Sequence, residues 1–356
     1  MKILAFAYPG DIDTPTGGYG YCRHIIAGLR DLGWTVDPIS LGEGFPQASE
    51  ATKAHALKIL QAVPSTTPIV VDGLAFGVLD KEADVLARSH KVIALVHHPL
   101  ALETSLSASE QELLCRSETR SLAAAHAVIT SSPATARTLA EGFAVPDDKI
   151  SVVVPGTARP APSSQRQRGQ TEPRLLSVGS LVPRKGHDML IDALADLQAL
   201  PWRLDIAGDD RLDVEHAQHL RSLITTENLQ DRVTLHGALP SDDLEALYTA
   251  ADIFVLATRY EGYGMAFAEA TVRGLPIVAT GSGAVADTIV PGTGLLFAPD
   301  DRAGFRDGLR RMISDAALRA ECAAAAIAAA NTYPTWEESS SRFAAAIEEL
   351  FTETPA

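Results

Sequence analysis

The sequence predicts an α/β protein made of two Rossmann-like domains that face each other across a cleft. Three observations favour this fold. The chain has 356 residues, too many for one ordinary hydrophobic core and suited to two domains of roughly 150–200 residues. Short apolar, β-branched segments alternate with helical patterns, as in parallel sheets with crossover helices. The pattern stops in residues 158–173, which have no periodicity, and then starts again.

The first half of the chain contains a regular series of predicted strands separated by helices. The helices include Gly20–Leu32 and Glu110–Ala125. Pro9 and Gly10 follow the first apolar segment at once, without a small-residue cleavage site, so this segment is interpreted as a buried strand rather than a secretory signal. The predicted strands are Lys2–Tyr8, Thr35–Ile39, Pro68–Val71, Lys91–Val96, Ala127–Thr130 and Ile150–Val154.

The second half repeats this organisation. The predicted strands are Arg174–Val178, Arg203–Ala207, Val233–His236, Ile253–Ala257 and Pro276–Ala279. The predicted helices between and after them are Gly186–Ala199, Val214–Glu227, Asp242–Ala250, Met265–Arg273, Ala316–Ala330 and Trp336–Phe351. In such sheets ligands bind beyond the carboxyl ends of the strands, so the chemistry is expected there.

These patterns give predicted domain boundaries. Residues 1–157 form a first Rossmann-like domain, 158–173 a linker and 174–335 a second Rossmann-like domain, while 336–356 form a C-terminal helix that packs back on the first domain.

Composition excludes several classes of protein. A net charge of −15 disfavours a general nucleic-acid binder, whose affinity depends on neutralising phosphates. No apolar run reaches the ~18 residues of a membrane span, and no basic stripe supports peripheral membrane contact. Cys22, Cys115 and Cys322 lie far apart without CxxC or histidine spacing. This disfavours disulfides and a zinc site, and it favours a reducing, cytoplasmic location.

The strongest motif follows the predicted strand Ile253–Ala257. A glycine-rich turn holds Glu261, Gly262 and Gly264, and the helix after it carries Glu269. Glycines let the backbone approach a ligand, and a helix N-terminus offers its N–H groups to a phosphate. One carboxylate lies before the helix and the other inside it, so the two can bond separated parts of one extended ligand.

This motif resembles the retaining enzymes of glycosyltransferase family four (glycosyl transferases group 1), whose hallmark is two glutamates with seven residues between them, here Glu261 and Glu269. The resemblance covers nearly the whole chain and implies that residues 1–157 are the acceptor-side domain and 174–335 the nucleotide-sugar-binding domain. It implies the GT-B fold, a nucleotide-sugar substrate, no cofactor and retention of anomeric configuration. It also implies that Glu269 holds the ribose hydroxyls. Glu261 would hold the transferred sugar and its phosphate together with the amides of Gly262, Tyr263, Gly264, Met265 and Ala266.

The segment Ser177–Gly186 resembles the family's strand and loop that bring basic residues to the donor diphosphate. Many members have Arg where this chain has Ser180, and Arg184 beside Lys185 is expected to substitute. Fixed cations stabilise the charge that develops on a departing nucleotide diphosphate. The alternative is a surface Arg–Lys pair without such a role.

Further candidates lie in the first domain. Gly17 and Gly18 follow the first strand, where the resemblance implies a loop that holds its amides against the diphosphate; the alternative is an ordinary turn. The family also places a donor-contacting histidine at the end of the fourth strand. His97 is preferred because it comes first after the strand, and His98 is the alternative. Glu103 is a weaker acceptor-side candidate, and the alternative is a solvent-facing residue of a helix.

Three other motifs are discounted. Asp11-Ile12-Asp13 spells the DxD that binds a metal in single-domain glycosyltransferases. No metal is expected here, because Lys185 and backbone dipoles serve that purpose. Residues 281–286 fit a dinucleotide pattern but correspond better to a family loop that ends in Glu, where Asp287 or nothing takes the place. Residues 208–210 are interpreted as structural.

The predicted function is that of a retaining, metal-independent hexosyltransferase. It moves a sugar from a nucleotide diphosphate donor, favoured to be UDP-linked over GDP or ADP, to a small-molecule, glycan or lipid-linked acceptor. The alternatives are a nucleotide-sugar epimerase or a glycosyl phosphorylase on the same fold, or a non-catalytic nucleotide-sugar binder. Release of free nucleotide only when an acceptor is present separates them.

Overall fold

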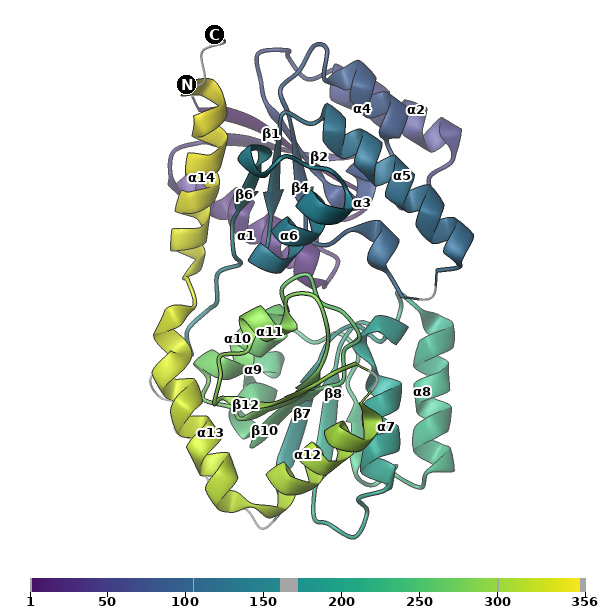
Figure 1. Cartoon of the computed structure of the whole chain (residues 1–356), viewed down its shortest axis with the longest axis vertical. Helices are drawn as coiled ribbons and strands as arrows, with labels where there is room; N and C mark the ends of the chain where they lie inside the picture. Colours follow the sequence, from purple (N-terminus) through teal and green to yellow (C-terminus); the bar gives the residue numbers. More distant parts are fainter. Residues whose placement is uncertain (1, 105, 161–171, 300, 353–356) are drawn as a thin grey trace. The chain divides into compact units, whose positions relative to one another are not determined.

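The structure, a computed structural model, describes residues 2–104, 106–160, 172–299 and 301–352. The chain divides into two compact units, residues 1–156 with 334–356 and residues 157–333. Of the predicted linker 158–173, residues 161–171 lie outside the described residues. Figure 1 shows the helices and strands of both units, coloured along the sequence.

The first unit is built on a six-stranded parallel sheet of order β2-β1-β3-β4-β5-β6. Its four central strands, β1, β3, β4 and β5, are short apolar runs buried on both faces, as expected in a sheet covered by helices on both sides, whereas the edge strands β2 and β6 are more exposed. Their bounds are β1 (Ile3–Tyr8), β2 (Thr35–Ser40), β3 (Ile69–Asp72), β4 (Val92–Val96), β5 (Ala127–Thr130) and β6 (Ile150–Val152).

Helices cover both faces of this sheet. Successive side chains of a strand point to opposite faces: Leu4 and Phe6 of β1 pack with α1 and α14, whereas Ala5 and Ala7 pack with the helices of the other face. α14 belongs to the first unit and packs beside α1 (Figure 1), and its Phe343 is fully buried. The helices are α1 (Gly17–Asp31), α2 (Glu50–Gln61), α3 (Gly73–Phe76), α4 (Asp80–Leu86), η1 (Leu100–Leu102), α5 (Ala108–Ala124), α6 (Pro133–Gly142), η2 (Asp147–Lys149) and α14 (Trp336–Thr352).

The second unit has a parallel sheet of the same kind, of order β12-β11-β10-β7-β8-β9. Because β7 and β10 are neighbours in this sheet, the loops that follow them lie at the same edge. The strands are β7 (Arg174–Val178), β8 (Arg203–Ala207), β9 (Val233–Leu235), β10 (Ile253–Leu256), β11 (Ile277–Thr280) and β12 (Gly294–Phe297).

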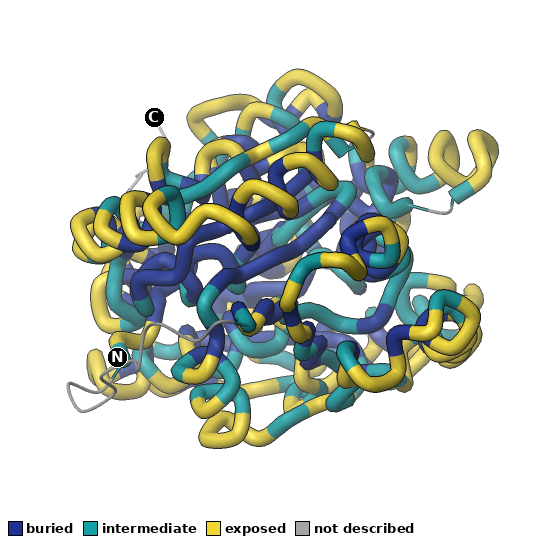
Figure 2. The backbone as a smooth tube through the Cα atoms, turned by 90° about the horizontal axis from the view of Figure 1, so that it is seen from below, coloured by how far each residue is buried: buried dark blue, intermediate teal, exposed yellow. Residues whose placement is uncertain are grey.

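Two apolar clusters fill the space between this sheet and its helices. One joins the sheet to α7, α8 and α12, and the other joins it to α9, α10 and α11. Figure 2 shows the buried backbone concentrated along the strands, with the exposed residues on the outer helices and loops. The helices are η3 (Pro183–Lys185), α7 (His187–Ala195), α8 (Val214–Thr226), α9 (Ser241–Ala250), α10 (Met265–Val272), α11 (Val285–Thr288), α12 (Arg302–Ser314), α13 (Ala316–Ala329) and η4 (Ala330–Thr332).

The predicted fold class of two parallel α/β sheets is confirmed. The sequence analysis missed β12 and α12. It also began the first helix too late: α1 begins at Gly17, not Gly20, because the Thr16 side chain accepts the Tyr19 N–H and caps the helix. Gly17 and Gly18 therefore lie in the first turn of a helix and not in a loop before it.

Candidate functional site: two glutamates and a basic turn

Glu261 lies just beyond the end of β10 and is bonded to both predicted cations. Its Oε1 lies 2.6 Å from the Lys185 Nζ and accepts a hydrogen bond from the Thr258 hydroxyl at 2.9 Å. Its Oε2 lies 3.5 Å from a guanidinium nitrogen of Arg184. Only 7% of the Glu261 side chain is exposed. Burial favours a higher carboxyl pKa, but the charges of Lys185 and Arg184 outweigh it and lower the pKa of Glu261. Glu261 is therefore ionised at neutral pH.

The basic turn η3 is pinned to the loop after β10. The N–H of Arg259 donates to the Arg184 carbonyl at 2.8 Å, and the Arg259 guanidinium bonds the Pro183 carbonyl and the Asp188 carboxylate. Gly186 ends the turn in the left-handed conformation (φ +65°), which glycine adopts without strain. These bonds hold Arg184 and Lys185 beside Glu261 independently of any ligand.

The predicted glycine-rich turn opens α10. Gly264 is the N-cap of this helix with φ +89°, and a Cβ there would lie 2.7 Å from the Phe267 ring. Glycine is therefore required by conformation and by space. Tyr263 is buried, which raises the pKa of its phenol, and its carbonyl accepts the Thr288 hydroxyl at 2.5 Å. The first-turn N–H groups of α10, including that of Met265, make this end of the helix suited to an anion.

Glu269 lies in α10 and is held differently from Glu261. The Tyr248 hydroxyl donates to its Oε2 at 2.8 Å, and Arg273 donates to its backbone carbonyl. Burial raises the pKa of Glu269, and the Tyr248 hydrogen bond and the Arg273 charge offset only part of that rise. The two glutamates thus have opposite electrostatics: Glu261 is held ionised, whereas Glu269 is shifted toward the protonated form.

The loop at residues 281–286 supports the backbone of Glu261. Glu261 and Gly283 form an isolated parallel bridge, and the Ala284 N–H donates to the Glu261 carbonyl at 2.9 Å. Asp287 lies in α11, where its N–H donates to the Ala284 carbonyl. This loop, which fits a dinucleotide pattern in the sequence, positions a glutamate in the structure.

The two histidines of the first unit have separate environments. Nε2 of His97 lies 3.4 Å from Oδ2 of Asp72. The His97 and Tyr21 rings pack in a T-shaped arrangement with their centroids 5.2 Å apart. A Cβ at Gly18 would lie 3.3 Å from the His97 ring, so this glycine makes room for it. His98 bonds Oε1 of Glu103 at 2.8 Å instead. The structure therefore brings Gly18 to His97, and Glu103 to His98.

A buried carboxylate holds the segment after these histidines. Glu118 of α5 accepts the N–H groups of Leu100 and Ala101 at 2.7 and 2.9 Å. Burial raises the pKa of Glu118 to about 7, against the opposing effect of the two N–H donors.

The remaining discounted motifs have local structural roles. The Asp13 N–H donates to the side chain of Asp11, closing an exposed turn. The Asp209 carboxylate pairs with the guanidinium of Arg211 at 2.8 Å.

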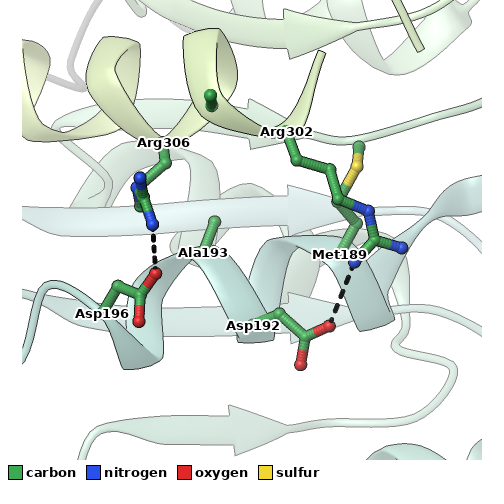
Figure 3. Close-up of a pocket in the computed structure, with 7 residues that line it drawn as sticks. Met189, Asp192, Ala193, Asp196, Arg302 and Arg306 are labelled. Carbon is green, nitrogen blue, oxygen red and sulfur yellow. Dashed lines mark hydrogen bonds and ion pairs between the residues drawn. The ribbon is translucent and has the colours of Figure 1, made fainter. Parts of the chain in front are cut away.

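A pocket between α7 and α12 does not include the predicted site residues. Ion pairs of 3.7 Å between Asp192 and Arg302 and of 2.5 Å between Asp196 and Arg306 span it (Figure 3). Met189, Ala193 and Ala303 complete its lining.

Sequence reasoning missed the residues that orient the site. Thr258 and Asp72 each directly follow a predicted strand, and polar residues at that position are a usable signal. The Arg259–Asp188 pair has no such signal, since Arg259 lies in the loop after β10 and Asp188 in the first turn of α7.

The architecture of the two units is that of known solved structures. Two six-stranded parallel sheets with helices on both faces are the GT-B architecture of glycosyltransferases. A sucrose-phosphate synthase structure from Thermosynechococcus elongatus matches over 99% of this chain and 100% of its own, with a TM-score of 0.84 and 20% identity. The Anabaena protein HepE, solved with UDP and glucose, matches over 97% and 100% with a TM-score of 0.76 and 18% identity. These likenesses establish the fold.

Sequence comparison identifies part of the chain more closely. Residues 160–329, somewhat less than half of it, match the family described as "Glycosyl transferases group 1", so this segment is a domain of that kind. Mannosylfructose-phosphate synthase of Agrobacterium fabrum is 32% identical over 48% of this chain and 41% of its own. A D-inositol 3-phosphate glycosyltransferase of Acidothermus cellulolyticus is 30% identical over 58% and 50%. The chain spans about half the length of the curated relatives it matches. Across the described residues, no helix is both long enough and apolar enough to cross a membrane.

Proposed function

We propose that this protein is a glycosyltransferase that moves a sugar from a nucleotide diphosphate donor to an acceptor. The observation that carries the proposal is the bonded group of Lys185, Arg184 and Glu261 beside the N-terminus of α10. Two fixed cations and a helix N-terminus suit a diphosphate, and a buried ionised carboxylate suits the hydroxyls of a sugar. The group 1 domain match and the printed names of the relatives support the same chemistry.

Within this proposal each residue has a distinct task. Lys185 and Arg184 stabilise the negative charge that develops on the departing diphosphate. Glu261 and the amides of residues 262–266 hold the transferred sugar and its phosphate. Glu269, bonded to the Tyr248 hydroxyl, holds the ribose hydroxyls. The candidates Gly17, Gly18, His97 and His98 of the first unit stay predictions.

The reaction proposed is direct transfer with retention of configuration. The bond between the anomeric carbon and the phosphate oxygen breaks, and the acceptor oxygen bonds the same carbon from the face that the nucleotide leaves. The acceptor hydroxyl proton goes to the departing phosphate. In this scheme Glu261 positions the sugar, and the cations of η3 serve the leaving group without a metal ion.

A UDP-sugar is the proposed donor. HepE was solved with UDP and with UDP-glucose, whereas a relative from Corynebacterium glutamicum, 30% identical over 51% of this chain and 49% of its own, is named as GDP-mannose-dependent. UDP, GDP and ADP are therefore compared by thermal shift. The nucleotide that raises the melting temperature most identifies the donor class, and a larger shift with GDP would overturn the UDP assignment.

The acceptor is then sought by nucleotide release from the matching donor. Several printed names contain a phosphorylated sugar or polyol, such as mannosylfructose-phosphate and inositol 3-phosphate, so such compounds come first. Acceptor-dependent release with a product that keeps the donor's anomeric configuration supports the proposal. Binding without turnover on every acceptor class would favour a non-catalytic binder.

A further inference from the structure

Three potential metal ligands from different parts of the first unit lie close together at the carboxyl ends of β3 and β4. Cys22 comes from α1, Asp72 ends β3, and His97 directly follows β4. The Sγ of Cys22 lies 3.6 Å from Oδ2 of Asp72 and 3.9 Å from Nε2 of His97, and the last two atoms are 3.4 Å apart. Within the part of the chain that the structure describes, Cys22, Asp72 and His97 form a group of three potential metal ligands whose ligand atoms all lie within 4.8 Å of one another.

These distances match one face of a tetrahedral zinc site. With zinc bonds of about 2.3 Å to sulfur and about 2.0–2.2 Å to nitrogen and oxygen, the edges of such a tetrahedron are roughly 3.3–3.7 Å. The edges to Asp72 fall within this range. The sulfur–nitrogen edge is longer by about 0.3 Å, a difference that a small side-chain rotation removes. One ion can therefore contact all three atoms without backbone movement.

The surroundings hold the ligands in place and leave a route to them. Oδ1 of Asp72 accepts the Leu74 N–H at 2.8 Å, which fixes the carboxylate as the N-cap of α3. The Ser131 hydroxyl donates to the His97 carbonyl at 3.1 Å. The Ser131 bond holds the backbone of His97, and the Leu74 bond to the Asp72 side chain is of the kind that orients ligands in metal sites. Cys22 is fully buried, whereas 21% of the His97 side chain is exposed, so an ion reaches the site past His97.

We propose that Cys22, Asp72 and His97 form a binding site for a thiophilic divalent cation of the zinc type, with water as the fourth ligand. A thiolate, an imidazole and one carboxylate favour zinc over magnesium or calcium, which prefer all-oxygen sites. The ion's charge balances the thiolate and the carboxylate, so the buried group becomes neutral overall.

Binding follows a balanced exchange. The aqueous ion loses all but one of its waters, the Cys22 thiol releases its proton to solvent, and His97 moves its ring proton from Nε2 to Nδ1 so that the Nε2 lone pair bonds the metal. In the absence of the ion, Oδ2 of Asp72 accepts from the Cys22 thiol and lies 3.4 Å from Nε2 of His97, so the same side chains stay in contact. Zinc would also occupy the Nε2 atom of His97 and so withdraw it from any other contact.

Cobalt(II) is the direct probe, because a cysteine thiolate bound to it gives a strong charge-transfer absorption. Reduced protein, stripped with EDTA and desalted, is titrated with Co²⁺ and then with Zn²⁺. We expect the band to saturate at one equivalent of Co²⁺ and to disappear as Zn²⁺ displaces it. This measurement does not depend on glycosyl transfer, so it stands or fails separately from the proposed function.

Variants assign the site. Cys22→Ser is expected to abolish the band, and Asp72→Asn to weaken Co²⁺ binding at least tenfold. Cys115→Ser, which removes a half-exposed thiol elsewhere in the unit, is the matched control and should leave the titration unchanged. Circular dichroism establishes that each variant is folded. A band that persists in Cys22→Ser, or wild-type protein that gives no saturable band, would overturn the proposal.

Discussion

Replacing Lys185 with methionine separates its charge from its packing. The side chain lies over Gly179, where a Cβ would be 3.0 Å from the Lys185 Cδ, and methionine keeps that apolar stem. The variant leaves the buried Glu261 carboxylate with Arg184 at 3.5 Å and the Thr258 hydroxyl. Removing one partner of a buried ion pair costs about 3–5 kcal/mol. Because Arg184 remains and 16% of Lys185 is exposed, we expect the lower end, about 3 kcal/mol.

The loss should depend on pH. In the wild type the pKa of Glu261 is lowered, so its stabilising contribution is present above the pKa of an unfolded carboxyl, about 4.3, and is lost as pH falls through the folded value. Without Lys185, burial is no longer outweighed and the pKa of Glu261 rises. A buried acid with a raised pKa destabilises the fold when ionised. The deficit should therefore be largest at neutral pH and shrink as pH falls toward about 5.

Trp202, which is fully buried in the second unit, reports the unfolding of that unit. Replacing Trp34 and Trp336, both in the first unit, with phenylalanine leaves Trp202 as the sole tryptophan. Urea unfolding followed by its fluorescence then gives the free energy for Lys185→Met, for Glu261→Gln and for the double variant. The double variant should lose about 3 kcal/mol, well below the sum of the single losses.

Glu215→Gln, at an exposed position of α8 in the same unit, is the control and should change stability by less than about 0.5 kcal/mol. Additive losses in the double variant, or a deficit that is the same at pH 7 and pH 5, would refute the reasoning. Turnover on an identified donor should also fall about a hundredfold in folded Lys185→Met.

Three further outcomes are expected. Gly264→Ala should destabilise the second unit by about 1–3 kcal/mol because of its positive φ and the nearby Phe267 ring, and a Trp202 unfolding curve equal to that of the wild type would contradict this. EDTA should leave nucleotide release intact, since Lys185 and Arg184 serve the leaving group, and a loss restored by manganese would contradict this. For Glu118 the folded pKa, about 7, lies above the unfolded value, so the first unit should lose stability as pH rises from about 4.5 to 7. Glu118→Gln should flatten this trend in urea unfolding followed by Trp34, and an unchanged slope would exclude the assignment.

The sequence predicts the fold well where periodicity and burial coincide. Strands such as β4 are uninterrupted apolar runs that can only be central in a sheet. β12 escaped prediction because it is a four-residue edge strand that is only partly buried and shows no alternation. α12 carries Gly304 and Gly308 inside it, and glycine weakens a helical pattern.

In the site, the sequence predicts the individual motifs but not the contacts between them. Each motif could be found locally, but the sequence assigns Lys185 to a diphosphate and Glu261 to a sugar as separate tasks. Their direct bond follows from the adjacency of β7 and β10, which are neighbours in the sheet although β8 and β9 lie between them in the sequence. Strand order is not readable from periodicity. For the same reason Asp72 was passed over, although it ends the strand next to that of His97.

The most direct test of the central claim compares UDP with uridine by isothermal titration calorimetry. If Lys185 binds the diphosphate and Glu269 the ribose, then Lys185→Met should weaken UDP at least tenfold and leave uridine unchanged, because a charge-assisted bond contributes about 1.5–3 kcal/mol. Glu269→Gln should weaken both ligands, and Glu215→Gln, an exposed control on α8, should weaken neither. UDP binding that is equally tight in the wild type and in Lys185→Met would contradict the account.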